Sequence, residues 1–184
     1  MGLTEYIKIY DLDQTICSEV YDFIISPKIE WTGHYFEHGS SKREENPENI
    51  LCSYPYEIMP SKLREDLEKI LWDNAFHYIK NFKYDVGIKY LTLPRFNKYN
   101  VGSYMSPHVD HIHSLFDGEK RGIPILTILV LYTANFSGGQ LFVCDENINL
   151  KKNQMVIFPS IFLYPHYVTK VETGERISSS SWIF

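Results

Sequence analysis

The sequence lacks most of the features that mark membrane, secreted and nucleic-acid-binding proteins. None of its apolar runs approaches the ~20 residues that a membrane-spanning helix needs. The first residues, MGLTEYIKIYDLDQT, carry acidic groups early and lack the basic and apolar regions of a secretory signal peptide, so we expect a cytoplasmic protein. The 18 lysines and arginines are scattered among 23 acidic residues, giving a net charge of −5. We therefore expect neither membrane attachment nor nonspecific binding to nucleic acid.

Cysteine is also scarce. The three cysteines, Cys17, Cys52 and Cys144, are odd in number and widely spaced, which gives no disulfide framework and suits a reducing compartment. Hydrophobic residues nevertheless make up 44% of the 184 residues and aromatic residues 15%, enough for a packed core. The length predicts a single domain over residues 1–184, and nothing in the sequence fixes its oligomeric state.

The first 86 residues predict an irregular and helical region that supports the rest of the domain. Two short apolar segments, YIKIY and YDFII, read as strands, and the polar run over residues 37–50 reads as a loop. Apolar residues recur at helical spacing over residues 60–82, with Ser61 placed as the N-cap. We expect this amphipathic helix to pack against a sheet.

Residues 87–184 predict a β-rich core. The segments are short, rich in β-branched and aromatic residues, and separated by turn signals; they cover residues 87–96, 125–134, 138–144, 154–159, 166–172 and 176–184. Gly138 and Gly139 mark a turn that needs positive φ. Since no strand is followed by a crossover helix, we expect an antiparallel sandwich or small barrel rather than a parallel sheet.

One stretch, Ser103–Phe116, holds three of the seven histidines. His108 and Asp110 lie two residues apart, so on an extended strand their side chains leave the same face and can share one metal ion. A third ligand must come from elsewhere, and His166 is the best candidate. A set of two histidines and one carboxylate on one face of an octahedral ion is the arrangement of non-haem Fe(II) oxygenases. We expect His111 and His113 to be loop residues rather than ligands.

An arginine follows the third candidate ligand. Arg176 comes ten residues after His166 (176 − 166 = 10), across the ETGE turn, so we expect it on the next antiparallel strand, close beside that histidine. Ser178, Ser180 and Trp182 would share its face. A guanidinium stays charged and binds a carboxylate in bidentate fashion, which suits a cosubstrate such as 2-oxoglutarate.

Taken in order, these motifs resemble those of the Fe(II)/2-oxoglutarate-dependent dioxygenases, and within them the prolyl 4-hydroxylase-like branch. The resemblance extends over roughly residues 87–184 and follows six elements in chain order: Tyr-x-x-Gly (Tyr99–Gly102), His108-x-Asp110, GGQL, FP, His166, and Arg176-x-Ser178 before a tryptophan-containing strand. It implies a mainly β fold with an N-terminal helix, specifically a double-stranded β-helix of the jelly-roll, cupin-like type. Residues 1–86 would then be the support region and residues 87–184 the oxygenase core.

The resemblance also implies cofactors and site residues. Fe(II), 2-oxoglutarate and O₂ would be required, with ascorbate as a candidate reductant. His108, Asp110 and His166 would ligate iron, while Arg176 and Ser178 would bind the distal carboxylate of 2-oxoglutarate and Tyr99 would reach it from the opposite wall. The reaction would hydroxylate a C–H bond, with peptidyl proline as the leading substrate and other protein side chains, amino acids, small metabolites and nucleobases as alternatives. Loops 37–57 and 111–122 would choose the substrate, the latter as a lid.

Two positions depart from the prolyl hydroxylase pattern. The tyrosine usual on the strand matching residues 127–133 is replaced by Leu131, with Tyr132 pointing away, so Thr127 could supply a hydroxyl to the cosubstrate instead. The branch often has lysine at the position of Arg176, so the arginine points to the wider superfamily.

Three alternatives stay open from the sequence. IKIYDLDQTI resembles the haloacid dehalogenase motif, which would make Asp11 a nucleophile in a parallel α/β fold. HVDHIH holds the letters of a binuclear metallo-hydrolase motif in reversed order. A cupin-like barrel could also bind a metal ion or small molecule without turnover.

Overall fold

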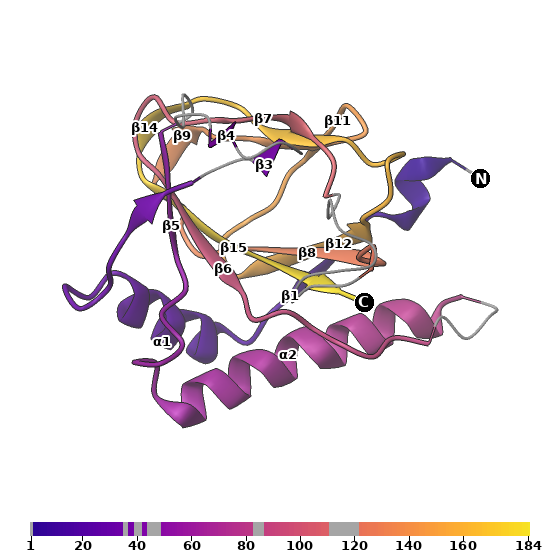
Figure 1. Ribbon diagram of the computed structural model, residues 1–184, viewed down its shortest axis with the longest axis horizontal. Coiled ribbons are helices and arrows are strands. Elements are labelled where there is room, and N and C mark those ends of the chain that lie inside the picture. The colour runs from indigo at the N-terminus through magenta and orange to yellow at the C-terminus, as the bar shows by residue number, and fades with distance from the viewer. Residues whose placement is uncertain (1, 35–36, 39–41, 44–48, 83–86, 111–121) are drawn as a thin grey trace.

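Two antiparallel β-sheets face each other, and two helices cover the outer side of the larger sheet (Figure 1). The computed structural model describes residues 2–34, 37–38, 42–43, 49–82, 87–110 and 122–184. No helix within these ranges is both long enough and apolar enough to cross a membrane. Cys17, Cys52 and Cys144 are free.

The larger sheet contains strands from both halves of the chain. Its order is β1 (Lys8–Asp11), β12 (Gln154–Pro159), β8 (Leu126–Leu131), β15 (Arg176–Ile183), β6 (Arg95–Tyr99), β5 (Ile50–Ser53) and β2 (Thr32–Gly33). Three of these strands, β1, β5 and β2, come from residues 1–86. The N-terminal region thus forms both edges of the sheet, in addition to the supporting role that the sequence predicted.

The smaller sheet has the order β11 (Glu146–Ile148), β10 (Leu141–Val143), β13 (His166–Val168) and β7 (Met105–His108). Two ribbons complete the strands: β14 (Val171–Gly174) with β9 (Phe136–Gly138), and β3 (Glu37–His38) with β4 (Lys42–Arg43). Gly138 and Gly139 have φ of +68° and +59°, as expected for their turn. The two facing sheets form a double-stranded β-helix, which confirms the fold predicted from the sequence.

Every strand pair in the described part of the chain is antiparallel, so the parallel sheet of a haloacid dehalogenase is absent there. Asp11, which that interpretation needs as a nucleophile, accepts a hydrogen bond of 2.8 Å from the Gln154 side chain at an exposed edge of the sheet. The dehalogenase interpretation is therefore wrong.

The first long helix, α1 (Gln14–Ile24), was not expected from the sequence. Asp13 caps it, because one carboxylate oxygen accepts hydrogen bonds from the backbone N–H groups of Thr15 and Ile16. The segment YDFII, read as a strand, is the end of this helix. A helical spacing of buried residues, Cys17, Val20 and Ile24, decides the structure in place of strand propensity.

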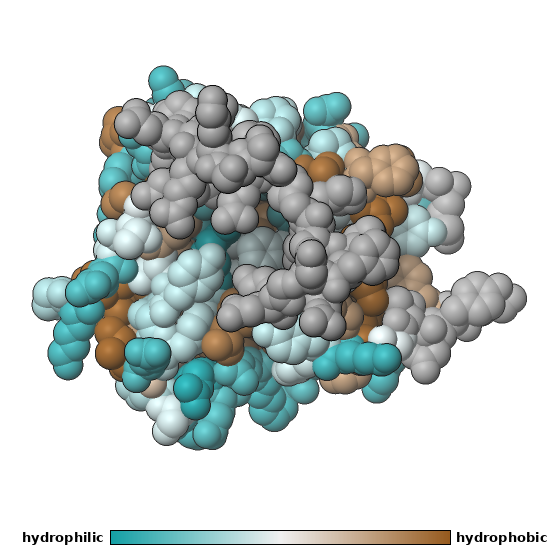
Figure 2. All heavy atoms as spheres, viewed as in Figure 1, coloured by the Kyte–Doolittle hydropathy of each residue, from teal (hydrophilic) through white to brown (hydrophobic). Residues whose placement is uncertain are grey.

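The second helix, α2 (Ser61–Lys80), lies where the sequence placed it. Pro60 rather than Ser61 occupies the N-cap position, so Ser61 is the first helical residue. Its buried stripe packs on the larger sheet and consists of Leu63, Leu67, Leu71, Ala75 and Tyr78. Figure 2 shows mostly hydrophilic side chains along the lower edge of the molecule, where α2 lies in Figure 1.

Alternation along the strands divides the interior into two layers. In β12, Met155 and Ile157 face the helices, while Val156 and Phe158 face the smaller sheet. The layer between the sheets is where polar side chains are also buried, and it holds the candidate site.

Candidate metal centre and its pocket

The structure brings the three predicted ligands together. His108 ends β7, His166 begins β13, and the two residues are directly opposed in the antiparallel pairing of these strands. Asp110 lies two residues beyond β7, and its two carboxylate oxygens lie 3.8 Å and 3.5 Å from the Nε2 atoms of His108 and His166. One ligand atom from each residue lies within 4.8 Å of the others, which is close enough to share one metal ion.

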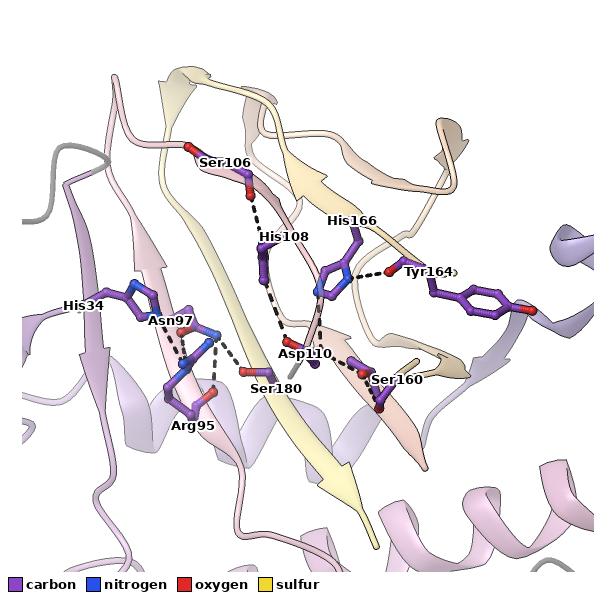
Figure 3. A network of polar contacts seen from close by, with 11 residues as sticks. His34, Arg95, Asn97, Ser106, His108, Asp110, Ser160, Tyr164, His166 and Ser180 are labelled. Atoms are coloured by element: carbon purple, nitrogen blue, oxygen red, sulfur yellow. Dashed lines mark hydrogen bonds and ion pairs between the residues drawn. The ribbon is translucent and has the colours of Figure 1, made fainter. Parts of the chain in front are cut away.

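Each imidazole is held by a backbone carbonyl two residues before it (Figure 3). His108 Nδ1 lies 2.8 Å from the Ser106 carbonyl oxygen, and His166 Nδ1 lies 3.1 Å from that of Tyr164. Because a carbonyl only accepts, each Nδ1 carries the proton and donates it. Each ring is thereby oriented with its Nε2 atom toward Asp110, the atom that would bind a metal ion.

Hydroxyl groups orient the carboxylate. Thr127 Oγ1 donates a 2.7 Å hydrogen bond to Asp110 Oδ2 and lies 2.7 Å from Ser160 Oγ. Burial acts to raise the pKa of Asp110, but the two histidines and the Thr127 hydrogen bond hold that pKa below its usual range. Burial and the neighbouring His166 lower the pKa of His108 to about 4. The set is thus an ionised carboxylate beside a neutral imidazole, the donor chemistry of a divalent cation.

A cavity that is open to solvent lies between the triad and the β6 and β15 strands of the larger sheet. The wall opposite the triad includes alternate residues of β15, namely Arg176, Ser178, Ser180 and Trp182, as the sequence predicted for one strand face. The predicted place of Arg176 relative to His166 was wrong. β15 pairs with β6 and β8 in the larger sheet, whereas β13 belongs to the smaller sheet, because the chain changes sheets between them through β14. Arg176 consequently lies on the wall opposite His166.

Arg176 is a buried cation with only 3% of its surface exposed. One terminal nitrogen donates a 2.7 Å hydrogen bond to Ser178 Oγ, and the guanidinium carbon lies 5.0 Å from the centre of the Tyr99 ring. Its Nε atom has no hydrogen-bond partner, and no carboxylate pairs with it, in the described part of the chain. Burial lowers the pKa of Arg176. A charge so placed requires an anion for stability.

The other predicted residues have different surroundings. Tyr99 lines the cavity beside Arg176. Thr127 is fully buried, and its hydroxyl forms hydrogen bonds with Asp110 and Ser160. This geometry indicates that Thr127 orients Asp110 rather than contacting a cosubstrate. Tyr132 points away from the cavity, as expected, and its hydroxyl lies 3.1 Å from Ser179 Oγ.

Some sequence predictions fall on parts of the chain that the structure does not describe. These are His111, His113 and nearly all of the proposed lid at 111–122, together with residues 39–41 and 44–48 of loop 37–57. The reversed binuclear motif depends on these histidines and therefore also lies outside the described residues.

Sequence reasoning missed a second polar group in the same cavity. Figure 3 shows His34, Arg95, Asn97 and Ser180 gathered near the triad, joined by hydrogen bonds. Arg95 and Asn97 both line the cavity. The signal was present, because Arg95, Asn97 and Tyr99 alternate along one strand and so share a face.

Comparison with known proteins identifies the matching region. Residues 94–184 match the family model described as the 2OG-Fe(II) oxygenase superfamily. A PKHD-type hydroxylase of Stenotrophomonas maltophilia is 30% identical over 129 residues, which cover 67% of this chain and 56% of the relative. One from Shewanella oneidensis is 34% identical over 95 residues, covering 49% and 42% respectively. The chain thus spans about half the length of these curated relatives.

Solved structures share the fold at low identity. A prolyl hydroxylase from Trichoplax adhaerens, in complex with a hypoxia inducible factor oxygen degradation domain peptide fragment, has a TM-score of 0.73 at 16% identity, covering 98% of this chain and 84% of that one. The viral collagen prolyl hydroxylase of Paramecium Bursaria Chlorella virus-1, as a 2OG complex, has a TM-score of 0.64 at 16% identity, covering 99% and 98%.

Proposed function

This chain belongs to the 2OG-Fe(II) oxygenase superfamily, and from that premise we propose that it is an Fe(II)- and 2-oxoglutarate-dependent dioxygenase that hydroxylates a C–H bond. One observation carries the proposal: a buried arginine without a carboxylate partner among the described residues faces a His–Asp–His cluster across one cavity. A metal-binding barrel without turnover would leave this arginine unexplained.

The donor set fits Fe(II). His108, Asp110 and His166 would hold the ion through two imidazole nitrogens and one carboxylate oxygen. Bound iron, together with 2-oxoglutarate and O₂, supplies the oxidising chemistry, in which hydroxylation of the substrate is coupled to the release of succinate and CO₂.

The opposite wall fits 2-oxoglutarate. Arg176 presents an unused Nε–H group and a positive charge, and Ser178 lies within hydrogen-bond distance of its guanidinium. A carboxylate there would satisfy the buried cation, which supports the distal carboxylate of 2-oxoglutarate as its partner. Tyr99, stacked on the same guanidinium, would fix its orientation.

The other contributions of the chain are positioning and exclusion of water. Thr127 holds the carboxylate of Asp110, with Ser160 behind it. Apolar side chains from both sheets, including Met105, Leu129 and Leu141, line the cavity and limit water near the reacting groups.

The proposal extends to the class of substrate. The Trichoplax adhaerens structure contains a peptide, which supports a protein or peptide substrate, with peptidyl proline first. A small molecule such as an amino acid fits the same cavity chemistry and is the second candidate.

The test is an anaerobic titration of the purified protein with Fe(II) and 2-oxoglutarate. We expect a weak visible charge-transfer band that requires both, and that is lost or weakened in Arg176→Ala and His166→Ala. A folded, iron-loaded wild type that shows no band would refute the assignment.

A further inference from the structure

A second arginine lies at the other end of the cavity wall. Arg95 begins β6 and is opposed to Ser180 on β15, whereas Arg176 begins β15 and is opposed to Tyr99 at the end of β6. Four residues of strand separate the two pairs (99 − 95 = 4), or about 13 Å at ~3.3 Å per residue. The cavity therefore has one guanidinium near each end of its wall, and the triad faces that wall.

Neutral groups hold Arg95 in place (Figure 3). Its Nε donates a 3.0 Å hydrogen bond to Asn97 Oδ1, and one terminal nitrogen lies 3.2 Å from His34 Nε2. Because arginine has no acceptor, His34 must accept this bond. Burial and the charge of Arg95 lower the pKa of His34 to about 3, so the imidazole stays neutral and able to accept. The guanidinium also stacks 5.3 Å from the centre of the Trp182 ring.

No ion pair involves Arg95 within the described residues. Its partners are an amide oxygen, an imidazole, the hydroxyl of Tyr54 and an indole ring, none of which carries negative charge. Two of its five N–H groups are left for other partners (5 − 3 = 2) once the bonds to Asn97, His34 and Tyr54 are made. Asn97 is itself held in this wall, because its Nδ2 donates a 3.2 Å hydrogen bond to Ser180 Oγ.

We propose that Arg95 is a substrate-binding residue that anchors a carboxylate group of the substrate itself. This inference rests on the proposed function, in which Arg176 is occupied by 2-oxoglutarate. A single planar guanidinium balances one negative charge and matches the geometry of a carboxylate, which favours this anion over a phosphate. The substrate would then be a small carboxylic acid or the C-terminal residue of a peptide, and an internal proline would lack the group that Arg95 binds.

The test is a crossed calorimetric titration of the metal-free protein. The ligands are acetate, N-acetyl-L-proline, its C-terminal amide, methyl phosphate and 2-oxoglutarate. The variants are Arg95→Met, Arg95→Lys, Arg176→Met and, as a matched control for charge, Lys98→Met. Lys98 is on the same strand as Arg95 but pairs with Glu175 and stacks on Trp31 instead of lining the cavity.

We expect Arg95→Met to weaken the binding of N-acetyl-L-proline at least about tenfold, while the affinity for 2-oxoglutarate stays within about twofold. The reason is that a charged hydrogen-bond partner has been removed from only one end of the cavity wall. Arg176→Met should do the reverse, and Lys98→Met should change neither. Arg95→Lys should keep part of the affinity for N-acetyl-L-proline. This variant replaces Arg95→Met in the test if the methionine variant fails to fold.

Unchanged N-acetyl-L-proline binding in the Arg95 variants would overturn the inference. So would equal binding of the amide, preference for methyl phosphate, or failure of every carboxylate other than 2-oxoglutarate to bind the wild type. Failure of 2-oxoglutarate alone to bind would count against the proposed function instead, and the N-acetyl-L-proline arm would still decide the role of Arg95.

Discussion

Tyr99 and Arg176 are directly opposed on β6 and β15, and the guanidinium carbon lies 5.0 Å from the ring centre. The register of two neighbouring strands thus determines where the positive charge of the cavity points. The tyrosine that the sequence offered as a cosubstrate ligand lies in direct contact with the arginine that it would assist.

Replacing Tyr99 by leucine should weaken 2-oxoglutarate binding roughly 3- to 30-fold, because a buried cation–aromatic contact contributes about 0.5–2 kcal/mol. Tyr99→Phe retains the ring and should lose less of this affinity. Calorimetry with 2-oxoglutarate measures both, and a phenylalanine variant as weak as the leucine variant would show that the hydroxyl, rather than the ring, matters.

Arg176→Met should stabilise the ligand-free protein while abolishing its response to 2-oxoglutarate. A buried cation without an anionic partner is costly, so a similarly shaped apolar side chain should raise the free energy of unfolding by roughly 1 kcal/mol or more. Urea unfolding with and without 2-oxoglutarate measures both effects. A less stable variant would mean that the Ser178 and Tyr99 contacts already compensate the charge.

Thr127→Val should lower metal affinity by about 10- to 100-fold, since the hydroxyl that orients Asp110 is lost with little change in shape. Ser160→Ala should have a smaller effect, because Ser160 reaches Asp110 only through Thr127. Competition with a coloured chelator for Co(II) gives both affinities. If the two variants lose equal affinity, the hydroxyl pair acts as one unit.

Gly138→Ala should destabilise the fold more than Gly102→Ala. Both glycines have positive φ, which alone costs a substituted residue roughly 1–3 kcal/mol. A Cβ at Gly138 would in addition lie 2.1 Å from the backbone oxygen of Lys170, whereas one at Gly102 meets nothing within 4 Å. Chemical denaturation compares them, and equal losses would mean that the backbone near Lys170 moves aside freely.

Alkaline stability should depend on Cys17. Burial, with the nearby Asp13 charge, raises the pKa of this thiol from 9.0 to about 11 in the folded protein. Between these values the unfolded chain loses the proton and the folded chain keeps it, so stability falls as pH rises from 9 to 11 and is unaffected below that window. Cys17→Ala should make the decline shallower, whereas a change at the half-buried Cys144 should matter less. Thermal unfolding across that pH range measures the slopes.

The sequence predicted the features that depend on local periodicity and on residue chemistry. The spacing of His108 and Asp110, the alternation of Arg176 with Ser178, and the stripe of α2 each correspond to an arrangement in the structure. These patterns are readable because a strand repeats every two residues and a helix every 3.6.

Features set by long-range contacts were not predictable in the same way. Whether Arg176 lies beside or across from His166 depends on a change of sheet at β14, which leaves no local signal. Asp13 resembled part of a catalytic motif, although its carboxylate caps a helix. The association of His34 with Arg95, 61 residues apart, follows from the position of β2 at the far edge of the sheet.

The contribution of both chain halves to one sheet constrains the order of folding during synthesis. β1 precedes the other strands of this sheet in the sequence, yet its partner β12 lies 149 residues later (Lys8 with Ile157; 157 − 8 = 149). β5 likewise waits for β6. Pairing between strands so distant in the sequence is slow, so the helices can form before the sheet does. The sheet closes only after β15 has been synthesised and has paired with both β8 and β6. Completion of the cavity wall therefore waits for β15, which follows all the other strands of this sheet in the sequence.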